Sequence, residues 1–140
     1  MNNFTFYNPV KIVFGKETIS QLESLLPKGN KILFLYGGGS IKKNSVYDQV
    51  IKSTSGFDVT EFSGIEANPQ YSTCLEAVNI IKEKKIDFVL AVGGGSVVDA
   101  AKFICAAAIS DSKDPWTDII LSSNIKKALP LGVVLTLPAT

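Results

Sequence analysis

The sequence of 140 residues contains no histidine and no arginine. Histidine is the commonest general base near neutral pH and a common metal ligand, so its absence removes the usual means of proton transfer and metal binding. Without arginine, and with 14 basic residues balanced by 13 acids, the chain lacks the strongly cationic surface of proteins that bind duplex nucleic acid. We therefore expect no nucleic-acid partner, no catalytic residue and no metal ligand within this chain.

Cysteines and long hydrophobic runs are also scarce. The two cysteines, Cys74 and Cys105, lie far apart within apolar helical patterns, which predicts buried thiols and not a disulfide framework. The apolar runs, such as residues 88–92 and 103–109, are much shorter than the roughly 20 residues that span a bilayer. The start of the chain lacks the charged and apolar regions of a secretion signal. We expect a cytoplasmic protein without a membrane partner.

Short aliphatic runs alternate with longer amphipathic segments along the chain. At 46% hydrophobic and 19% charged residues, the composition is that of a globular protein, and the length fits one domain over residues 1–140. This alternation predicts an α/β fold, a Rossmann-like parallel sheet with helices on both faces, preceded by an amino-terminal β-hairpin over residues 4–14. The expected strands span residues 31–36, 57–62, 86–92 and 131–137. The expected helices span residues 18–26, 45–53, 71–85 and 97–109, and a further short helix lies within 111–128.

A glycine-rich turn, Gly93-Gly94-Gly95-Ser96, follows the strand expected over residues 86–92. A phosphate group needs bare amide groups and the positive end of a helix, and glycines let the backbone approach it closely. The turn therefore indicates phosphate binding, and a tight strand-to-helix turn without a ligand is the alternative. Asp99 and Lys102 follow on the same helix. They form either a plain surface ion pair or a site where Asp99 meets a ribose hydroxyl.

A second run, Gly37-Gly38-Gly39-Ser40, follows the strand expected over residues 31–36. NAD sites commonly place an acid after a strand to accept the ribose 2′-hydroxyl, and that acid repels a 2′-phosphate. No acid follows Tyr36, whereas Lys42 and Lys43 add positive charge. The pattern therefore favours NADP over NAD, and a loop with incidental lysines is the alternative. Neither run matches a GxGxxG or a Walker A motif, which argues against a P-loop nucleotidase.

Five motifs follow one another along the whole chain. They are Phe14-Gly15, Tyr36-Gly37-Gly38-Gly39-Ser40, Ile65-Glu66-Ala67-Asn68-Pro69, Gly93-Gly94-Gly95-Ser96-Val97-Val98-Asp99-Ala100-Ala101-Lys102 and Leu135-Thr136-Leu137-Pro138-Ala139-Thr140. In these motifs the sequence resembles the iron-containing (group III) alcohol dehydrogenases, and within them the butanol dehydrogenase branch that reduces aldehydes with NADPH. The resemblance implies the amino-terminal, dehydroquinate synthase-like cofactor-binding domain of a longer enzyme.

The resemblance also implies which residues contact NADP(H). The pyrophosphate contacts fall on Gly94, Gly95, Ser96 and Val97, and Asp99 lies beside the nicotinamide half. The adenosine end maps to Gly37, Gly38, Ser40 and Asn68, and the final strand adds Thr136 and Thr140. On the residues alone, Asn68 is equally a loop former before Pro69, and Thr136 is an ordinary strand residue. Family members with an aspartate at the position of Gly37 or Gly38 prefer NAD.

The resemblance places the rest of the chemistry outside this chain. The family's metal ligands, one aspartate and three histidines, belong to a helical carboxyl-terminal domain, and no position here matches them. Reduction of an aldehyde by NADPH to a primary alcohol would need that domain and its iron or zinc, so we expect this chain alone to bind cofactor without turnover.

The resemblance further implies a homodimer in which the amino-terminal strand pairs across two copies, which would protect an exposed edge. Two alternatives to a domain of this enzyme stay open. One is a non-catalytic nucleotide- or phosphate-binding module complete at this length. The other is a glycerol dehydrogenase-like enzyme of the same fold.

Overall fold

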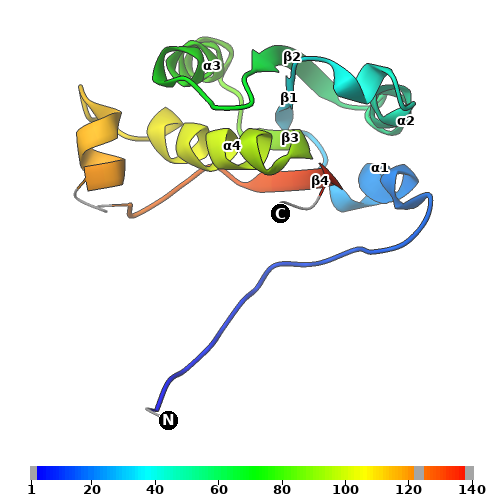
Figure 1. The fold of residues 1–140 in the computed structure, drawn as a ribbon, viewed down its shortest axis with the longest axis horizontal. Coiled ribbons are helices and arrows are strands. Elements are labelled where there is room, and N and C mark those ends of the chain that lie inside the picture. Colours follow the sequence, from blue (N-terminus) through cyan, green and yellow to red (C-terminus); the bar gives the residue numbers. More distant parts are fainter. Residues whose placement is uncertain (1–2, 122–124, 138–140) are drawn as a thin grey trace.

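A computed structural model describes residues 3–121 and 125–137, and a parallel sheet of four strands forms its centre (Figure 1). The strands are β1 (Lys31–Gly37), β2 (Asp58–Ile65), β3 (Phe88–Gly94) and β4 (Leu131–Leu137), in the order β2-β1-β3-β4. All three pairings are parallel. The carboxyl ends of the four strands therefore meet at one edge of the sheet. The predicted α/β class and parallel sheet are confirmed.

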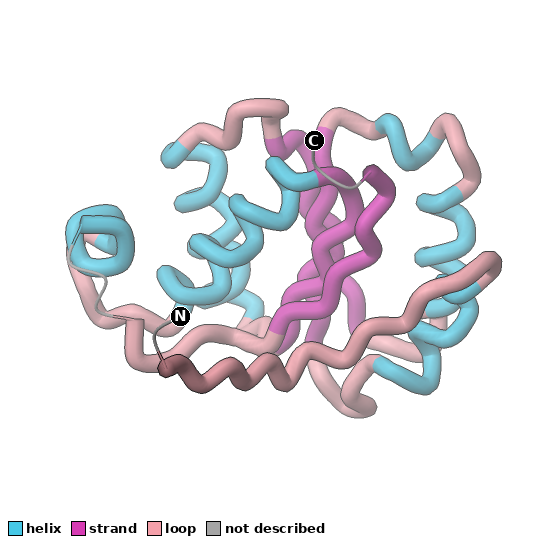
Figure 2. The backbone as a smooth tube through the Cα atoms, turned by 60° about the horizontal axis from the view of Figure 1, so that its bottom comes forward, coloured by secondary structure: helices cyan, strands magenta, loops and turns pink. Residues whose placement is uncertain are grey.

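Helices cover both faces of this sheet. In Figure 2 the strands lie between two groups of helices. On one face, α3 (Tyr71–Lys84) and α4 (Gly95–Ala108) enclose a core with side chains such as Leu35 and Val89. On the other face, α1 (Leu22–Leu25) and α2 (Val46–Ser53) pack over alternate side chains of the same strands, such as Phe34 and Leu90. The inner strands are buried nearly throughout, as expected of strands covered on both sides.

Short helical turns complete the chain between these elements. They are the 3-10 turns η1 (Thr18–Gln21) and η2 (Ser40–Lys42) and the π-helical turn η3 (Thr117–Leu121).

Trp116 lies just before η3, with its ring 5.7 Å from that of Tyr71 and 6.2 Å from that of Phe103. These aromatic contacts fasten the segment after α4 to the outer surface of α3 and α4.

The predicted amino-terminal hairpin does not form within this chain. No strand occurs between Asn3 and η1, and Phe4, Phe6 and Phe14 are 78%, 79% and 97% exposed. Figure 1 shows this segment running away from the body of the fold. The backbone amide of Val10 donates to Oδ1 of Asn8, which forms a local turn across Pro9 and gives that one amide a partner. An isolated two-stranded hairpin is marginal in water, so the prediction was wrong because no third element covers these residues.

Within the part of the chain that the structure describes, no helix is long and apolar enough to cross a bilayer. Both cysteines are free and buried. The cytoplasmic location stays a prediction.

Candidate functional site

A cleft of about 530 Å³ opens at the carboxyl ends of the strands. This volume lies within the roughly 300–1,000 Å³ of small-molecule sites. Its walls come from the turns after β1, β2 and β3 and from the end of β4, and its lining residues are Gly38, Ile65, Glu66, Ala67, Gly94, Gly95, Ser96, Val97, Asp99 and Leu137. Ligands of open parallel sheets bind at this edge. The cleft is therefore the candidate site.

Two glycines let the turns pack directly against the first turn of α4. A Cβ at Gly93 would lie 2.7 Å from Cγ2 of Val97, and a Cβ at Gly37 would lie 3.1 Å from the carbonyl oxygen of Ile65 and 3.5 Å from Val97 Cγ2. Real Cβ atoms essentially never make contacts shorter than 3.0 Å of this kind. A side chain at Gly93 would therefore force Val97 to shift. The bare backbone at these positions draws the turns after β1 and β3 together beneath the cleft.

The amino terminus of α4 points its free amides at the same cleft. Gly94 is the N-cap residue, and no side chain caps the helix. The first four amides of a helix have no partner within it, and with the helix dipole they make a site for an anion. Gly94 and Gly95 line the cleft, and a Cβ at Gly94 would meet nothing closer than 3.8 Å. The geometry fits an anionic group such as a phosphate.

The structure brings most of the predicted contact residues to this cleft. Six of them line it: Gly38, Gly94, Gly95, Ser96, Val97 and Asp99. Gly37 lies just beneath it, and Thr136 precedes the lining residue Leu137 in β4. Ser40, at the start of η2, and Asn68 are exposed residues outside the lining set. Thr140 lies outside the described residues. Contact of each with a cofactor stays a prediction.

Asp99 and Lys102 form an ion pair on the surface of α4. Lys102 Nζ lies 3.6 Å from Asp99 Oδ1, and the two side chains are 67% and 74% exposed. Exposed pairs of this kind contribute little to stability. The pair leaves Asp99 at the cleft wall, where a bound ribose would compete for its carboxylate.

Glu66 is a cleft residue to which the sequence analysis gave no role. Its Oε1 accepts a hydrogen bond of 2.7 Å from Thr73 Oγ1, and its Oε2 accepts one of 3.3 Å from the amide of Gln70. The bond from Thr73 lowers the pKa of Glu66 below its usual value. The carboxylate thus anchors the loop after β2 to the start of α3. The signal in the sequence was an acid seven residues before a side-chain hydroxyl, since a backbone amide such as that of Gln70 leaves no mark in the sequence.

Ser96 ties this loop to the start of α4. Its hydroxyl donates a hydrogen bond of 2.6 Å to the carbonyl oxygen of Ala67. A serine hydroxyl has one proton to donate. In this arrangement the donors that face an anion at the turn are backbone amides, and the Ser96 side chain positions the loop instead.

Replacing Ser96 with alanine should loosen the loop over residues 65–70. We expect a loss of about 1 kcal/mol in stability, the usual worth of one hydrogen bond, and faster amide hydrogen exchange confined to that loop and the first turn of α4. Ser20→Ala is the matched control, because Ser20 also donates its hydroxyl to a backbone carbonyl, that of Glu17, at 2.8 Å. Equal exchange in the two variants at residues 65–70 would show that the Ser96 bond does not hold the loop.

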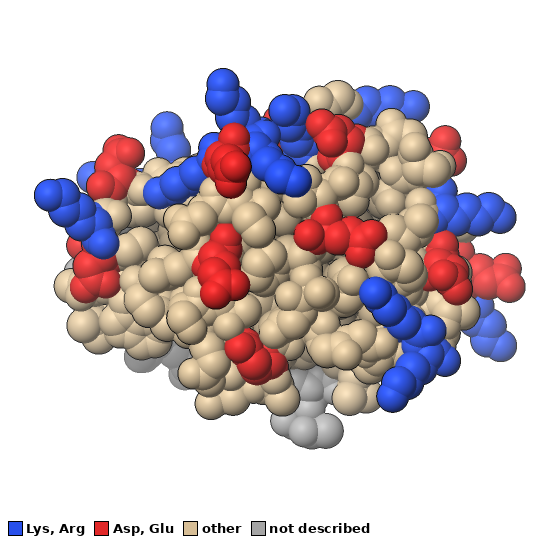
Figure 3. All heavy atoms as spheres, turned by 90° about the horizontal axis from the view of Figure 1, so that it is seen from above, with Lys and Arg blue, Asp and Glu red and all other residues tan. Residues whose placement is uncertain are grey.

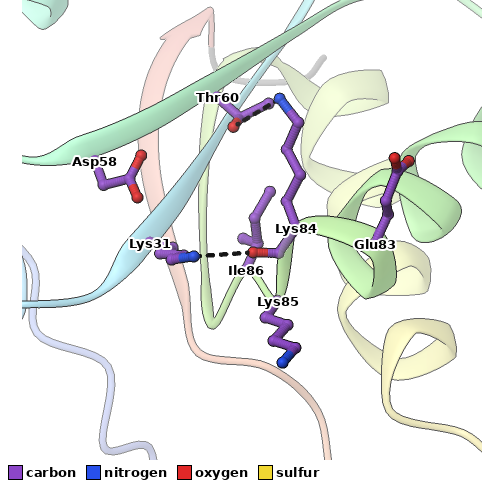
Figure 4. Close-up of a pocket in the computed structure, with 7 residues that line it drawn as sticks. All are labelled: Lys31, Asp58, Thr60, Glu83, Lys84, Lys85 and Ile86. Carbon is purple, nitrogen blue, oxygen red and sulfur yellow. Dashed lines mark hydrogen bonds between the residues drawn. The ribbon is translucent and has the colours of Figure 1, made fainter.

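A second hollow, of about 420 Å³, lies at the opposite edge of the sheet (Figure 4). Lys84 Nζ donates to Thr60 Oγ1 across it at 3.4 Å, and Lys31 Nζ donates to the Lys84 carbonyl oxygen at 3.4 Å. Glu83 and Lys85 point away from each other in Figure 4. Because its polar groups bond one another or diverge, this hollow offers no convergent set of contacts to a ligand.

Among the described residues, neither the face seen in Figure 3 nor the two thiols offer a second site. Acidic and basic side chains are interspersed over the face in Figure 3. Burial raises the pKa of Cys105 to about 12, so its thiol stays protonated and unreactive. In residues 3–121 and 125–137, no three side chains among histidine, cysteine, aspartate and glutamate come together as a metal site would require.

Comparison with known proteins identifies a family whose profile matches nearly the whole chain. A sequence profile described as "Iron-containing alcohol dehydrogenase" matches residues 9–140. The chain is 50% identical over 142 residues to the "NADPH-dependent aldehyde reductase YqhD" of Escherichia coli. It is 49% identical over 143 residues to the "Probable NADH-dependent butanol dehydrogenase 1" of Bacillus subtilis. Each alignment covers all of this chain and 37% of the relative.

A solved structure has the same fold. The crystal structure of the NADH-dependent butanol dehydrogenase A of Thermotoga maritima superposes with a TM-score of 0.94 and 49% identity, over 100% of this chain and 36% of that one. The chain therefore spans little more than a third of the length of the proteins it matches. Their names divide between NADPH and NADH.

Proposed function

This chain belongs to the iron-containing alcohol dehydrogenase family, and we propose that residues 1–140 form the dinucleotide-binding domain of an enzyme that interconverts primary alcohols and aldehydes. The relatives that share half of its sequence are alcohol dehydrogenases and aldehyde reductases. The proposal extends their activity to this protein because the match runs through every turn that lines the cleft.

The observation that carries the proposal is the uncapped amino terminus of α4 at the floor of the cleft. When bound, a nicotinamide dinucleotide would supply or accept the hydride. The amides of Gly94 and Gly95 would bind its pyrophosphate, and Gly38 would lie under its adenosine end. These groups bind and orient. We assign no proton transfer to any residue of this chain.

We further propose that the cofactor is NADP(H). Gly37, Gly38 and Ser40 present no carboxylate where an adenine ribose would lie, and two lysines follow within three residues. Sequence identity does not decide the matter, since relatives at 50% and 49% identity are named for NADPH and NADH respectively. The preference rests on local charge.

The metal that the family name implies does not fit the described residues, since they offer no cluster of three ligands. We propose that any iron or zinc is held by residues other than these, and that these residues alone bind cofactor without catalysing turnover.

We also propose that the amino-terminal segment pairs two copies of the protein. Residues 3–14 are extended and have no partner strand among the described residues. The exposed apolar side chains of Phe4, Phe6 and Ile12 would be covered by such pairing.

Titration of the intact protein with NADPH and NADH tests this function. We expect NADPH to bind at least tenfold more tightly than NADH, as measured by the fluorescence of Trp116 or of the cofactor. We also expect NADPH-dependent reduction of short-chain aldehydes once the divalent metal is added. Tighter binding of NADH would refute the NADP preference. Binding of neither dinucleotide would refute the cofactor domain, and binding without any reduction by the intact protein would favour a non-catalytic module.

A further inference from the structure

Four side chains from four elements meet beneath the turn that joins β1 to η2. Tyr36 ends the buried part of β1, Tyr47 lies on α2, Glu61 lies on β2 and Lys42 ends η2. Phe34 pairs with Glu61 in the sheet, so the side chains of Phe34, Tyr36 and Glu61 share the face that α2 covers. We name Tyr36, Lys42, Tyr47 and Glu61 the tyrosine–glutamate cluster.

Both tyrosines donate to the same carboxylate. Tyr36 Oη lies 3.0 Å from Glu61 Oε2, and Tyr47 Oη lies 2.9 Å from Oε1 and 3.1 Å from Oε2. Each phenol has one proton to give, so Glu61 receives both. These bonds connect β1, β2 and α2 at the end of the sheet that carries the cleft.

Lys42 rests on the aromatic rings of the same cluster. Its Nζ lies 4.7 Å from the ring centre of Tyr47 and 5.4 Å from that of Tyr36. Both distances are within the roughly 6 Å of a cation–π contact. The Tyr47 and Tyr36 rings are themselves in edge-to-face contact at 5.9 Å. The charge of Lys42 is thus held against aromatic faces on the α2 side of the sheet.

The cluster fixes the downstream arm of the glycine turn. The amide of Lys42 donates to the Gly39 carbonyl oxygen at 3.0 Å, and Gly39 has a φ of +94°, a conformation that favours glycine. Ile41 is 2% exposed. With Tyr36 bonded on one side of the turn and Ile41 and Lys42 on the other, Gly38 is left facing the cleft.

The side chain of Lys43, unlike that of Lys42, has no bonding partner among the described residues. Its side chain is exposed, and it makes no hydrogen bond or ion pair with any described residue. Its backbone amide donates to the Ser40 carbonyl oxygen at 3.0 Å, which keeps the residue beside the turn. Of the two lysines after the glycines, only Lys43 has an uncommitted charge.

We infer that the tyrosine–glutamate cluster is a positioning device that shapes the Gly37–Ser40 turn, and that Lys43, not Lys42, is the specificity-determining lysine that meets the 2′-phosphate of NADPH. This inference rests on the proposed cofactor-binding function. Lys42 contributes to the binding of either dinucleotide through the shape of the turn. Lys43 contributes only where a phosphate is present.

A matched pair of variants, Lys42→Met and Lys43→Met, separates the two roles in the intact protein. Each substitution keeps an unbranched side chain and removes one positive charge. For Lys43→Met we expect the dissociation constant of NADPH to rise about tenfold, the scale of a lost charge-assisted hydrogen bond, while that of NADH stays unchanged. For Lys42→Met we expect both constants to rise by the same factor. Lys28→Met, at an exposed position remote from the turn, is the control.

The dissociation constants of the variants test the inference, and those of the wild-type protein test the proposed function. A loss selective for NADPH in Lys42→Met, or no selective loss in Lys43→Met, would overturn the inference while leaving cofactor binding intact. A wild-type protein that binds neither dinucleotide, or prefers NADH, would overturn the proposed function instead.

Tyrosine ionisation tests the cluster without any cofactor. The hydrogen bond to Glu61 raises the pKa of Tyr47 to about 12, with smaller contributions from burial and from the neighbouring Tyr36 and Asp48. In Glu61→Gln, which removes the carboxylate charge, we expect this pKa to fall toward the ordinary value near 10, measured by ultraviolet absorbance of the phenolate. An unchanged titration would show that the cluster does not form in solution.

The same shift predicts how stability depends on alkaline pH. A tyrosine whose folded-state pKa is raised stabilises the fold fully below its unfolded pKa, and this contribution is lost as pH rises through the folded value. We therefore expect the free energy of unfolding to fall between pH 10 and about 12. In Tyr47→Phe, which keeps the ring under Lys42, the fall over this interval should be smaller. Urea unfolding at a series of pH values measures both, and parallel curves would contradict the assignment.

Discussion

Replacing Gly93 with alanine is expected to unfold the first turn of α4 and to abolish dinucleotide binding. The new methyl group would lie 2.7 Å from Cγ2 and 3.0 Å from Cβ of Val97. Both atoms belong to a buried side chain on the helix that begins two residues later. Overpacking of this kind costs roughly 3 kcal/mol when the neighbour cannot move freely. Any relief by a shift of the helix would displace the amides that face the cleft.

The free energy of unfolding, measured with urea, and the affinity for NADPH should therefore fall together in Gly93→Ala. Gly38→Ala is the matched control, because a Cβ at Gly38 meets nothing within 4 Å, and we expect a change in stability within about 0.5 kcal/mol. Adding Val97→Ala to Gly93→Ala removes the closer of the two clashing atoms and should restore part of the stability. A Gly93→Ala protein as stable as the wild type would show that the turn is not tightly packed against α4.

The periodicity of the sequence was sufficient to predict the sheet and most of its helices. Leu131–Leu137 is the strand expected over residues 131–137, and Tyr71–Lys84 differs by one residue from the helix expected over 71–85. These segments are long and strongly patterned. The strand is followed in the sequence by Pro138, and the helix ends at the left-handed residue Lys85. Local pattern predicts such elements because their apolar side chains must share one face or alternate between two.

The prediction of the amino-terminal hairpin was wrong because local pattern does not determine whether a strand has a partner. Residues 4–14 alternate like strands, but a strand needs a partner, and alternation does not say whether one is available within the chain. The bond from the Val10 amide to Asn8 closes a local turn instead. An edge that pairs with another copy and an extended segment without a partner have the same pattern in sequence.

Contacts between distant residues could not be read from spacing. The bonds from Ser96 to Ala67 and from Tyr36 to Glu61 join residues 29 and 25 positions apart. They depend on the strand order, which no local motif records. The glycines illustrate the same point. At Gly93 and Gly37 the absence of a side chain allows close packing against Val97, whereas Gly38 and Gly94 are open to the cleft. The sequence places all four in equivalent runs.

Replacing Gly38 with aspartate is expected to reverse the cofactor preference. Gly38 lines the cleft, a Cβ there meets nothing within 4 Å, and its φ is not among the positive values of this chain. An aspartate would therefore fit without strain. Its carboxylate would accept a hydrogen bond from the free 2′-hydroxyl of NADH and would repel the 2′-phosphate of NADPH. At about 4 Å and an effective dielectric constant near 20, two unit charges interact by about 4 kcal/mol. Allowing for screening, we expect NADPH affinity to fall roughly 100-fold.

Gly38→Asn isolates the charge, since asparagine has nearly the same volume and shape as aspartate but no negative charge. Dissociation constants of NADPH and NADH for the two variants, measured on the intact protein, give the comparison. If Gly38→Asn loses as much NADPH affinity as Gly38→Asp, the effect is steric and the missing acid says nothing about the cofactor. If only the aspartate discriminates, and more strongly at low salt than at high salt, the phosphate lies within reach of this turn.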